Sequence, residues 1–244
     1  MIDADLTVKD VIAEAHNVKT FRFSLSDLPS GQALTQKPGQ FVSVQVPAPD
    51  GVQVRSFSIS SSPLQQDHLD ITVKRYEDSS AASALHELKA GDQLHVRGPY
   101  GMFTFKDDDR NPVFIAGGNG VTPHMAMIRY IVGKGLPTKP ILIYSNRTTA
   151  DVIFKDELER YGREGKIVAD ITLTNEPEGS AWKGLVGRVD AGMIQKLAAP
   201  LGEKTFFLCG PPEMVRALHE TLLGLGVSEQ QIRMEQFIRP KKTV

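Results

Sequence analysis

The stretch Val113–Pro123 reads VFIAGGNGVTP and decides how the second half of the chain folds. Its first four residues form an apolar run typical of a buried strand, and the proline at its end suits the first turn of a helix. Between them, the glycines let the backbone approach a ligand closely. A strand, a glycine-rich loop and a helix in this order predict a dinucleotide-binding unit, although such a loop alone is a weak signal.

The segments that follow this stretch alternate between strand and helix patterns. Strands are predicted at 113–116, 141–144, 167–173, 205–208 and 231–234, and helices at 123–132, 154–161, 189–197 and 212–223. Repeated strand–helix units imply a parallel, doubly wound α/β sheet. We therefore expect five parallel strands in this half.

The first half of the chain shows short alternating runs broken by Pro, Gly, Asp or Ser. Strands are predicted at 6–13, 18–25, 40–46, 54–60, 69–76 and 93–96, with one short helix at about 81–88. Six such strands suggest a small closed antiparallel β barrel of the Greek-key type. The charged stretch Lys106–Pro112 is typical of a solvated linker. Two domains are expected, at 1–108 and 111–244.

Bulk properties limit the function classes. A chain of 244 residues with 41% hydrophobic content can hold two separate cores. A net charge of -1 gives no electrostatic reason to expect binding to nucleic acid or to an anionic membrane. The N-terminus lacks the features of a signal peptide, and no apolar run approaches the roughly 20 residues of a membrane span. We expect a cytoplasmic protein without membrane insertion.

The sequence contains one cysteine, Cys209. One cysteine cannot form an internal disulfide, and it cannot hold a thiolate-ligated iron–sulfur cluster within this chain. We predict no metal site.

Four further motifs accompany the glycine-rich loop in a fixed order. They are Arg55-Ser56-Phe57-Ser58, Gly98-Pro99-Tyr100-Gly101, Cys209-Gly210-Pro211-Pro212-Glu213-Met214 and Met234-Glu235-Gln236-Phe237. Together with the loop they resemble the ferredoxin–NADP reductase superfamily, whose members pass electrons between a nicotinamide and a bound flavin. The resemblance extends from Leu6 to Phe237, and it implies an FAD-binding barrel followed by an NAD(P)-binding domain.

The resemblance assigns the first of these motifs to the flavin. Arg55 would pair with the flavin pyrophosphate, a bidentate role that suits a guanidinium. Phe57 would pack on the flavin ring, although the family usually has tyrosine there and the phenol's hydrogen bond is lost. Ser58 would place its hydroxyl near flavin N5. The preceding Pro38-Gly39-Gln40-Phe41 also matches the family.

Two more segments belong to the flavin side by the same resemblance. Ile71 and Val73 lie in Ile71-Thr72-Val73-Lys74-Arg75, which matches the family's next segment. Ala82 and Ser83 open the short helix where the family usually has glycine, and their backbone N–H groups would hold the pyrophosphate. A serine cap without a ligand is the alternative. The motifs favour FAD over FMN.

On the nicotinamide side, the resemblance assigns the dinucleotide to Gly118 and Gly120 and places Thr122 near the nicotinamide. By pattern alone, Cys209 would be a buried core thiol. The resemblance instead places it beside the nicotinamide, where it helps to align C4 with flavin N5. The same motif adds Gly210, Pro211 and Met214 as contacts.

The last motif carries an acid. By pattern alone, Glu235 would be a surface residue. The resemblance places it with Ser58 and Cys209 in a hydrogen-bonded proton network around the reacting ring, and these three form the predicted catalytic set. Phe237 would lie near the flavin. The segment beyond it, 238–244, would be a frayed tail or a docking strip for an acidic partner.

The choice between NADH and NADPH depends on Tyr144–Ile153, where the adenosine ribose would lie. Arg147 would meet a 2′-phosphate and so favours NADPH. However, Asn146-Arg147-Thr148 followed by Asp151-Val152-Ile153 resembles the flavin modules of nitrate reductases and microsomal cytochrome reductases, which mostly use NADH. The prediction is NAD(P)H, with NADH preferred.

The implied reaction is hydride transfer between nicotinamide C4 and FAD N5, followed by release of single electrons. The predicted acceptor is a separate protein such as a ferredoxin or an oxygenase component. One alternative is a reductase of small acceptors such as free flavin, ferric chelates or quinones. Another is a nucleotide-binding subunit of a larger redox complex.

Overall fold

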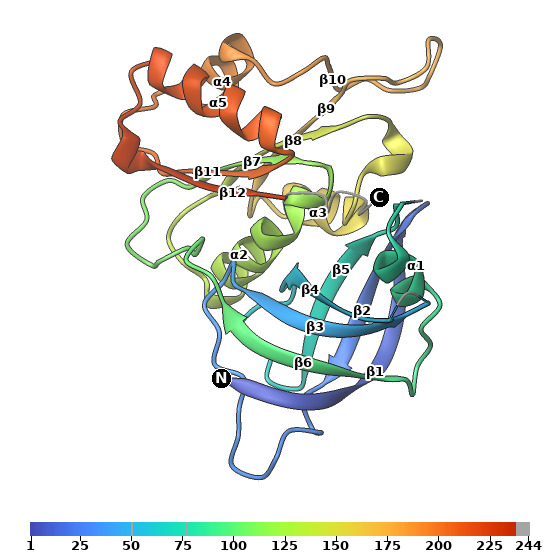
Figure 1. Ribbon diagram of the computed structural model, residues 1–244. Helices are drawn as coiled ribbons and strands as arrows, with labels where there is room; N and C mark the ends of the chain where they lie inside the picture. Colours follow the sequence, from blue (N-terminus) through green and yellow to red (C-terminus); the bar gives the residue numbers. More distant parts are fainter. Residues whose placement is uncertain (50, 77, 238–244) are drawn as a thin grey trace. The chain divides into compact units, whose positions relative to one another are not determined.

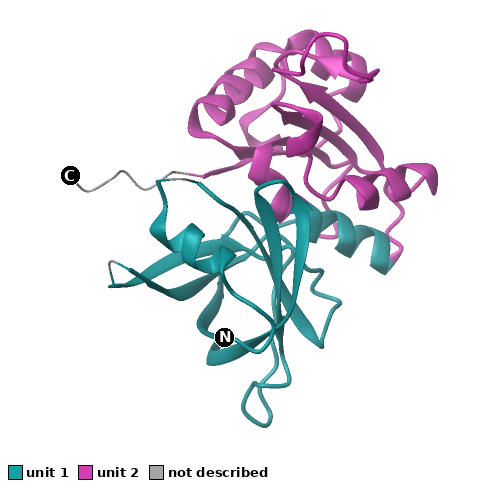
Figure 2. Cartoon of the chain, turned by 90° about the vertical axis from the view of Figure 1, so that its right-hand side faces the viewer, with its two compact units in different colours: residues 1–105, 125–134, 239–244 teal, residues 106–124, 135–238 magenta. Residues whose placement is uncertain are grey.

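The computed structural model describes residues 1–49, 51–76 and 78–237. They form two compact units (Figure 2). Unit 1 contains residues 1–105 and 125–134, and unit 2 contains residues 106–124 and 135–237. The predicted frayed tail at 238–244 lies outside the described residues.

Unit 1 is built on a six-stranded antiparallel sheet, as predicted (Figure 1). Its strands are β1 (Ile2–Ala15), β2 (Val18–Ser24), β3 (Phe41–Ala48), β4 (Gly51–Ser58), β5 (His68–Lys74) and β6 (Gln93–Tyr100). The spatial order is β4-β3-β6-β1-β2-β5, so β6 lies between strands from much earlier in the chain. Directly after β4, Ile59 forms an isolated antiparallel bridge with Ile71 on β5, the strand at the other edge of the sheet.

In unit 1, the side chains of alternate strand residues point inward and form the core. Phe21 and Phe23 on β2 are fully buried, and so are Val42 and Val44 on β3. The helix α1 (Ser80–His86) buries Leu85 and contacts β3 and β5. A hydrogen bond from Gln53 to Ser80 also links this helix to β4, the strand that carries the arginine motif.

Unit 2 contains a parallel sheet with helices on both faces (Figure 1). Its strands are β7 (Val113–Gly117), β8 (Ile141–Asn146), β9 (Val168–Leu173), β10 (Leu185–Val186), β11 (Phe206–Gly210) and β12 (Ile232–Gln236). The doubly wound sheet is confirmed, but the prediction of five strands was wrong, because β10 adds a sixth. A strand of two residues carries no period that a sequence pattern can reveal.

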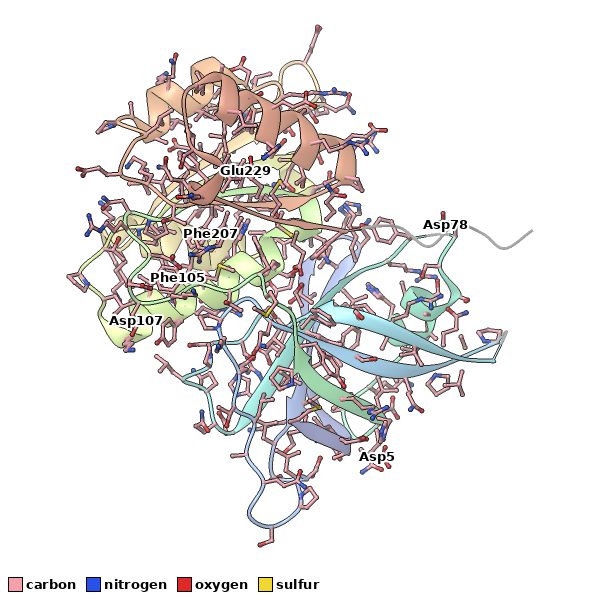
Figure 3. The ribbon with its side chains drawn as sticks, turned by 60° about the vertical axis from the view of Figure 1, so that its left-hand side comes forward. Asp5, Asp78, Phe105, Asp107, Phe207 and Glu229 are labelled. Carbon is pink, nitrogen blue, oxygen red and sulfur yellow. The ribbon has the colours of Figure 1, made fainter. Side chains whose placement is uncertain are left out.

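The helices of unit 2 separate into two layers. They are α2 (Val121–Lys134), shared with unit 1, and α3 (Lys155–Arg163), α4 (Ala191–Ala198) and α5 (Pro212–Gly224). Side chains of α4 and α5 pack on one face of the sheet, against Ile115, Ile143 and Leu208. On the other face, Phe207 (Figure 3) contacts Phe114 with ring centroids 5.3 Å apart. In the described part of the chain, no helix has the length and apolarity of a membrane span.

The strand order of unit 2 identifies where a ligand would bind. The order is β10-β9-β8-β7-β11-β12, so the chain starts in the middle at β7, proceeds to one side and later returns to the other. In open parallel sheets, ligands bind at the carboxyl ends of the strands where the order reverses. Here that point lies between the ends of β7 and β11.

The stretch Lys106–Pro112 is only partly a solvated linker. Asp107 (Figure 3) is exposed as expected, but Asp109 is buried. Its carboxylate accepts hydrogen bonds from both terminal nitrogens of Arg233 on β12. The expectation failed at this residue because its partner lies 124 residues away in the sequence.

Candidate cofactor sites

The arginine motif lies on β4, an edge strand of unit 1. Arg55 and Phe57 are half-buried, Ser56 between them is exposed, and Ser58 is buried. Arg55 donates to the Val54 carbonyl at 3.1 Å and to the Gln53 side chain. Its Nε is buried and has no hydrogen-bond partner among the described residues. An unsatisfied buried guanidinium N–H is costly, and a bound phosphate would satisfy it.

The first turn of α1 lies beside this arginine. The Gln53 side chain, which accepts from Arg55, donates to the hydroxyl of Ser80 at 2.7 Å. Ser79 caps the helix by accepting from the Ala82 N–H at 3.2 Å, and its carbonyl accepts from the Ser83 N–H at 3.0 Å. Both predicted phosphate donors on α1 therefore already have partners, so an anion would have to displace the serine cap. Arg55 remains the better fit to a pyrophosphate.

The remaining flavin-side residues divide between surface and core. Phe57 packs against the edge of the barrel core, and Ser58 ends β4 opposite Phe41 on β3. Ile71 and Val73 on β5 point into the core and are 0% and 2% exposed. Only the backbone of these two residues is left to contact a cofactor.

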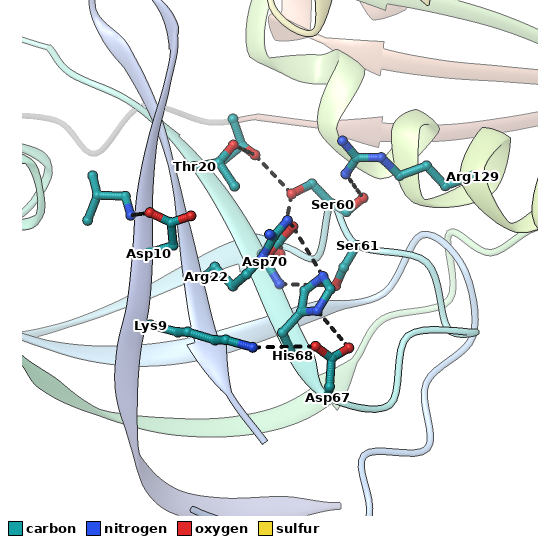
Figure 4. Close-up of polar contacts among 12 residues, drawn as sticks. Lys9, Asp10, Thr20, Arg22, Ser60, Ser61, Asp67, His68, Asp70 and Arg129 are labelled. Atoms are coloured by element: carbon teal, nitrogen blue, oxygen red, sulfur yellow. Dashed lines mark hydrogen bonds and ion pairs between the residues drawn. The ribbon is translucent and has the colours of Figure 1, made fainter. Parts of the chain in front are cut away.

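A polar network fixes the chain directly after Ser58, and the sequence patterns did not single it out (Figure 4). The hydroxyls of Thr20 and Thr72 lie 2.8 Å apart, and those of Thr72 and Ser60 lie 2.9 Å apart. Arg129 on α2 donates to the Ser60 carbonyl at 2.7 Å. The run of serines directly after the arginine motif was the one feature of the sequence that could have indicated this network. Because Ser60 is two residues from Ser58, these bonds hold the end of β4 in place.

The glycine-rich loop of unit 2 lies at the carboxyl end of β7. Gly118 has a φ of +52°, in the left-handed region, and no atom lies within 4 Å of the position of a Cβ. A Cβ on Gly120 would lie 2.2 Å from the carbonyl oxygen of Cys209, so the loop packs directly on β11. The Thr122 hydroxyl donates to the Asn119 carbonyl at 2.7 Å, and the Tyr144 hydroxyl donates to the Gly118 carbonyl at 3.0 Å. The loop is held rigidly with an open side.

The cysteine motif meets this loop from the neighbouring strand. Ala116 on β7 is paired with Cys209 on β11. A Cβ on Gly117 would lie 2.4 Å from the sulfur of Met214 and 3.1 Å from Pro211. A Cβ on Gly210 would in turn lie 3.2 Å from the Gly117 nitrogen. The structure thus brings together Gly118, Gly120, Thr122, Cys209, Gly210, Pro211 and Met214 at the point where the strand order reverses.

Cys209 and Glu235 lie opposite each other on β11 and β12. Burial raises the pKa of the Cys209 thiol well above its ordinary value, and the nearby Glu235 charge raises it further, so the thiol is neutral and a poor nucleophile. Burial also raises the pKa of Glu235 to about 7. Its Oε2 is buried and has no hydrogen-bond partner in the described part of the chain. Glu235 can therefore exchange a proton near neutral pH.

The predicted catalytic set is divided between the two units. Cys209 and Glu235 belong to unit 2, and Ser58 belongs to unit 1. Phe237 follows β12, and its N–H donates to the Gly210 carbonyl at 3.0 Å, which ties the end of β12 to the cysteine motif. Arg147 is exposed directly after β8.

Comparison with known proteins identifies the family. Residues 5–105 match the oxidoreductase FAD-binding domain, and residues 114–220 match the oxidoreductase NAD-binding domain. Ferredoxin–NADP reductase B of Sorangium cellulosum is 32% identical over 228 residues, which cover 90% of this chain and 91% of that protein. The chain belongs to the ferredoxin–NADP reductase family. FAD and NAD(P)H are accordingly its expected cofactors.

Two further matches extend the comparison. The glycine betaine monooxygenase reductase subunit of Pseudomonas aeruginosa is 33% identical over 230 residues, 93% of this chain. The chain spans 62–64% of the length of the reductase subunits that it matches. Among solved structures, the FAD/NAD-binding domain of nitric oxide dioxygenase from Vibrio cholerae superposes with a TM-score of 0.86 at 23% identity, covering 96% of this chain and 98% of that one. This last match supports the fold alone.

Proposed function

We propose that the chain is an NAD(P)H-dependent flavoprotein reductase that passes single electrons to a separate acceptor protein. The observation that carries this proposal is the half-buried Glu235 opposite Cys209 at the nucleotide end of unit 2, whose Oε2 is buried without a hydrogen-bond partner among the described residues and whose pKa burial raises to about 7. A domain that only bound nucleotides would have no need of a proton-exchanging group there. The proposal thus favours an enzyme over a nucleotide-binding subunit.

On the flavin side, Arg55 would hold the pyrophosphate through its buried Nε, which has no partner among the described residues. Phe57 would pack on the ring, and the hydroxyl of Ser58 would lie near N5. When bound, the flavin supplies the conversion of a two-electron hydride into single electrons, which no side chain can perform. The protein would position the flavin, and the hydrogen bonds to Ser60 hold the neighbouring Ser58 in place.

On the nucleotide side, Gly118 and Gly120 would receive the dinucleotide backbone, and Thr122 would lie near its nicotinamide end. The neutral Cys209 thiol would border the nicotinamide without attacking it. Glu235 would hold or release a proton beside it. Productive transfer needs the reacting atoms about 3–3.5 Å apart, and these side chains would set that approach.

The acceptor is proposed to be a ferredoxin or an oxygenase component. The names of two relatives support this, a ferredoxin–NADP reductase and the reductase subunit of a monooxygenase. A reductase of free flavin, ferric chelates or quinones is the second candidate. Reduction of cytochrome c that requires added ferredoxin would favour the protein acceptor, and equal rates without it would favour the small one.

The first experiment is an absorbance spectrum of the purified protein loaded with FAD, before and after anaerobic NADH or NADPH. We expect the oxidised-flavin bands to be present and to bleach. A protein that does not bind FAD under any reconstitution condition would overturn the proposal in favour of a nucleotide-binding subunit.

A further inference from the structure

The first half of β1 is hydrogen-bonded to the sheet of unit 1 on one side. Residues 2–7 pair with β6, whereas the pairing of β1 with β2 begins only at Val8. On the other side of this segment, the Thr7 N–H donates to the Asp27 carboxylate at 2.7 Å. A strand segment with one neighbour opens more readily than one with two, because fewer backbone hydrogen bonds must break. The contacts between residues 2–7 and β6 therefore decide how firmly this segment is held.

The side chains of this segment alternate between core and surface. Ile2 and Leu6 are fully buried, whereas Asp3 and Asp5 (Figure 3) are exposed. On β6, the residue paired with Asp5 is His95. The outer face of the two strands thus brings acidic side chains of β1 next to a histidine of β6.

The imidazole of His95 lies between two carboxylates. Its Nδ1 is 2.8 Å from Asp5 Oδ1, and its Nε2 is 2.7 Å from Asp3 Oδ1. A neutral imidazole carries one N–H, so it donates to one carboxylate and turns a lone pair toward the other. An imidazolium carries two N–H groups and donates to both. The arrangement therefore fits the protonated ring, which joins one residue of β6 to two residues of β1.

The charges around the ring favour the same form. The second oxygen of Asp3 accepts from Arg97 Nε at 2.9 Å, and Gln45, the residue paired with His95 on β3, is uncharged. With His95 protonated, the two positive side chains balance the two aspartates, whereas the neutral ring leaves one negative charge in excess. The hydrogen bond to Asp5 raises the pKa of His95 most, partial burial opposes this effect, and Asp3 adds to the rise.

We propose that His95 is a pH-dependent clasp that holds residues 2–7 of β1 on β6. Because the folded form has the higher pKa, the clasp is fully effective below the ordinary histidine pKa of 6.5 and is lost as the pH rises through the raised value. The segment then opens more often while the rest of the unit stays folded. Since Ile2 pairs with Gly98, this opening also releases the first residue of the Gly98–Gly101 motif. The inference does not depend on the proposed function.

Amide hydrogen exchange of the full chain tests the clasp. Protection factors, which correct for the pH dependence of chemical exchange, are compared at pH 5.5 and 8.5 for residues 2–7 and for β2. The reference to β2 removes any change in the global stability of the unit. In the wild type, the relative protection of residues 2–7 should fall by about threefold, the size expected when exposed ion pairs are lost. His95→Gln should show the lower relative protection at both pH values. A wild type without this fall, or an equal fall in His95→Gln, would overturn the proposal.

His219→Gln is the matched control. His219 on α5 also contacts a carboxylate, with its Nε2 2.8 Å from Glu229, but both residues belong to unit 2. The fall in relative protection of residues 2–7 should be the same in this variant as in the wild type. Loss of the pH response in both histidine variants would overturn the proposal, because the response would then not come from the contacts of His95.

Asp5→Asn tests whether two carboxylates are needed, and it serves in place of His95→Gln if that variant does not fold. The neutral ring can accept from the new amide at one nitrogen and donate to Asp3 at the other, so deprotonation no longer breaks a contact. We expect most of the pH response to disappear, and a magnetic resonance titration should show the pKa of His95 closer to 6.5 than in the wild type. Retention of the full response in Asp5→Asn would overturn the proposal.

Discussion

The two units prepare their candidate sites by different means. Unit 1 uses side chains, since Arg55, Gln53 and Ser80 form a linked chain of hydrogen bonds from β4 to α1. Unit 2 uses the backbone, since Gly118 and Gly120 place the main chain itself at the ligand-binding edge. The site in unit 1 can lose one side-chain contact while the fold around it stays intact. The site in unit 2 depends on the absence of side-chain atoms at its glycines.

This difference predicts how each unit responds to substitution. In unit 1, removing a side chain should weaken one ligand contact and leave the barrel intact. In unit 2, adding a single carbon at Gly120 should force β11 away from the loop. The following predictions are ordered from the largest expected effect to the smallest, and each one tests this contrast.

Gly120→Ala should give the largest effect. Its Cβ would lie 2.2 Å from a backbone oxygen of Cys209, and backbone cannot move aside as a flexible side chain can. We expect destabilisation of about 3 kcal/mol, together with loss of ADP binding. Urea unfolding and calorimetry measure the two quantities.

The matched control is Gly162→Ala on α3, where nothing lies within 4 Å of the new carbon. This variant should be neutral or stabilising by up to about 1 kcal/mol, because alanine favours a helix. Equal destabilisation by both substitutions would break the contrast, since it would mean that crowding on β11 is not the cause.

Arg55→Ala should weaken FAD binding without unfolding unit 1. A charged hydrogen bond contributes about 1.5–3 kcal/mol, so a loss of roughly tenfold to hundredfold in affinity is expected. Fluorescence titration of the apoprotein with FAD measures it. Arg97→Ala is the control, because that arginine is exposed on β6 and pairs only at the surface with Asp3. Full FAD retention in Arg55→Ala would remove this residue from the site.

Glu235→Gln should remove a pH dependence of the free energy of unfolding. The pKa of Glu235 in the fold, about 7, is raised above its ordinary value of 4.5, so the fold favours the protonated form. Its stabilising contribution is complete below pH 4.5 and is lost as the pH rises through about 7. The wild type should therefore lose about 2 kcal/mol of stability relative to Glu235→Gln between pH 5.5 and 8. Urea unfolding at both pH values tests this, and a constant difference would contradict the raised pKa.

Thr72→Val should have the smallest effect. It removes the hydroxyl between Thr20 and Ser60 in a buried network. We expect destabilisation of about 1 kcal/mol and a modest decrease in the rate of flavin reduction, because Ser58 is held less firmly. Ser56→Ala, on the exposed face of β4, should change neither quantity. A larger effect here than in Gly120→Ala would reverse the comparison between the units.

The sequence predicted the parts of the fold that repeat locally. The period of two along β2 and β3 and the strand–loop–helix unit at Val113–Pro123 indicated both sheets. The parts that it did not predict depend on contacts between residues far apart in the sequence. Glu176 meets Thr149 across 27 residues and Arg233 meets Asp109 across 124, and no local pattern encodes such pairs.

The candidate site shows the same division. The glycines of the loop and the cysteine motif were predicted and are brought together, because both follow strands whose carboxyl ends meet at one edge. At Ala82 the sequence offered the serine cap as an alternative but could not choose it, and it did not indicate the inward orientation of Ile71. Both depend on how the neighbouring elements pack, which a motif does not specify.

The buried, neutral thiol of Cys209 has a practical consequence. It is 1% exposed and is the one cysteine in the sequence, so thiol-directed alkylating reagents should leave the folded protein unmodified. A cysteine introduced at an exposed position would be the single accessible thiol on the molecule. The natural sequence is thus already suited to attaching one fluorophore or spin label at a chosen place.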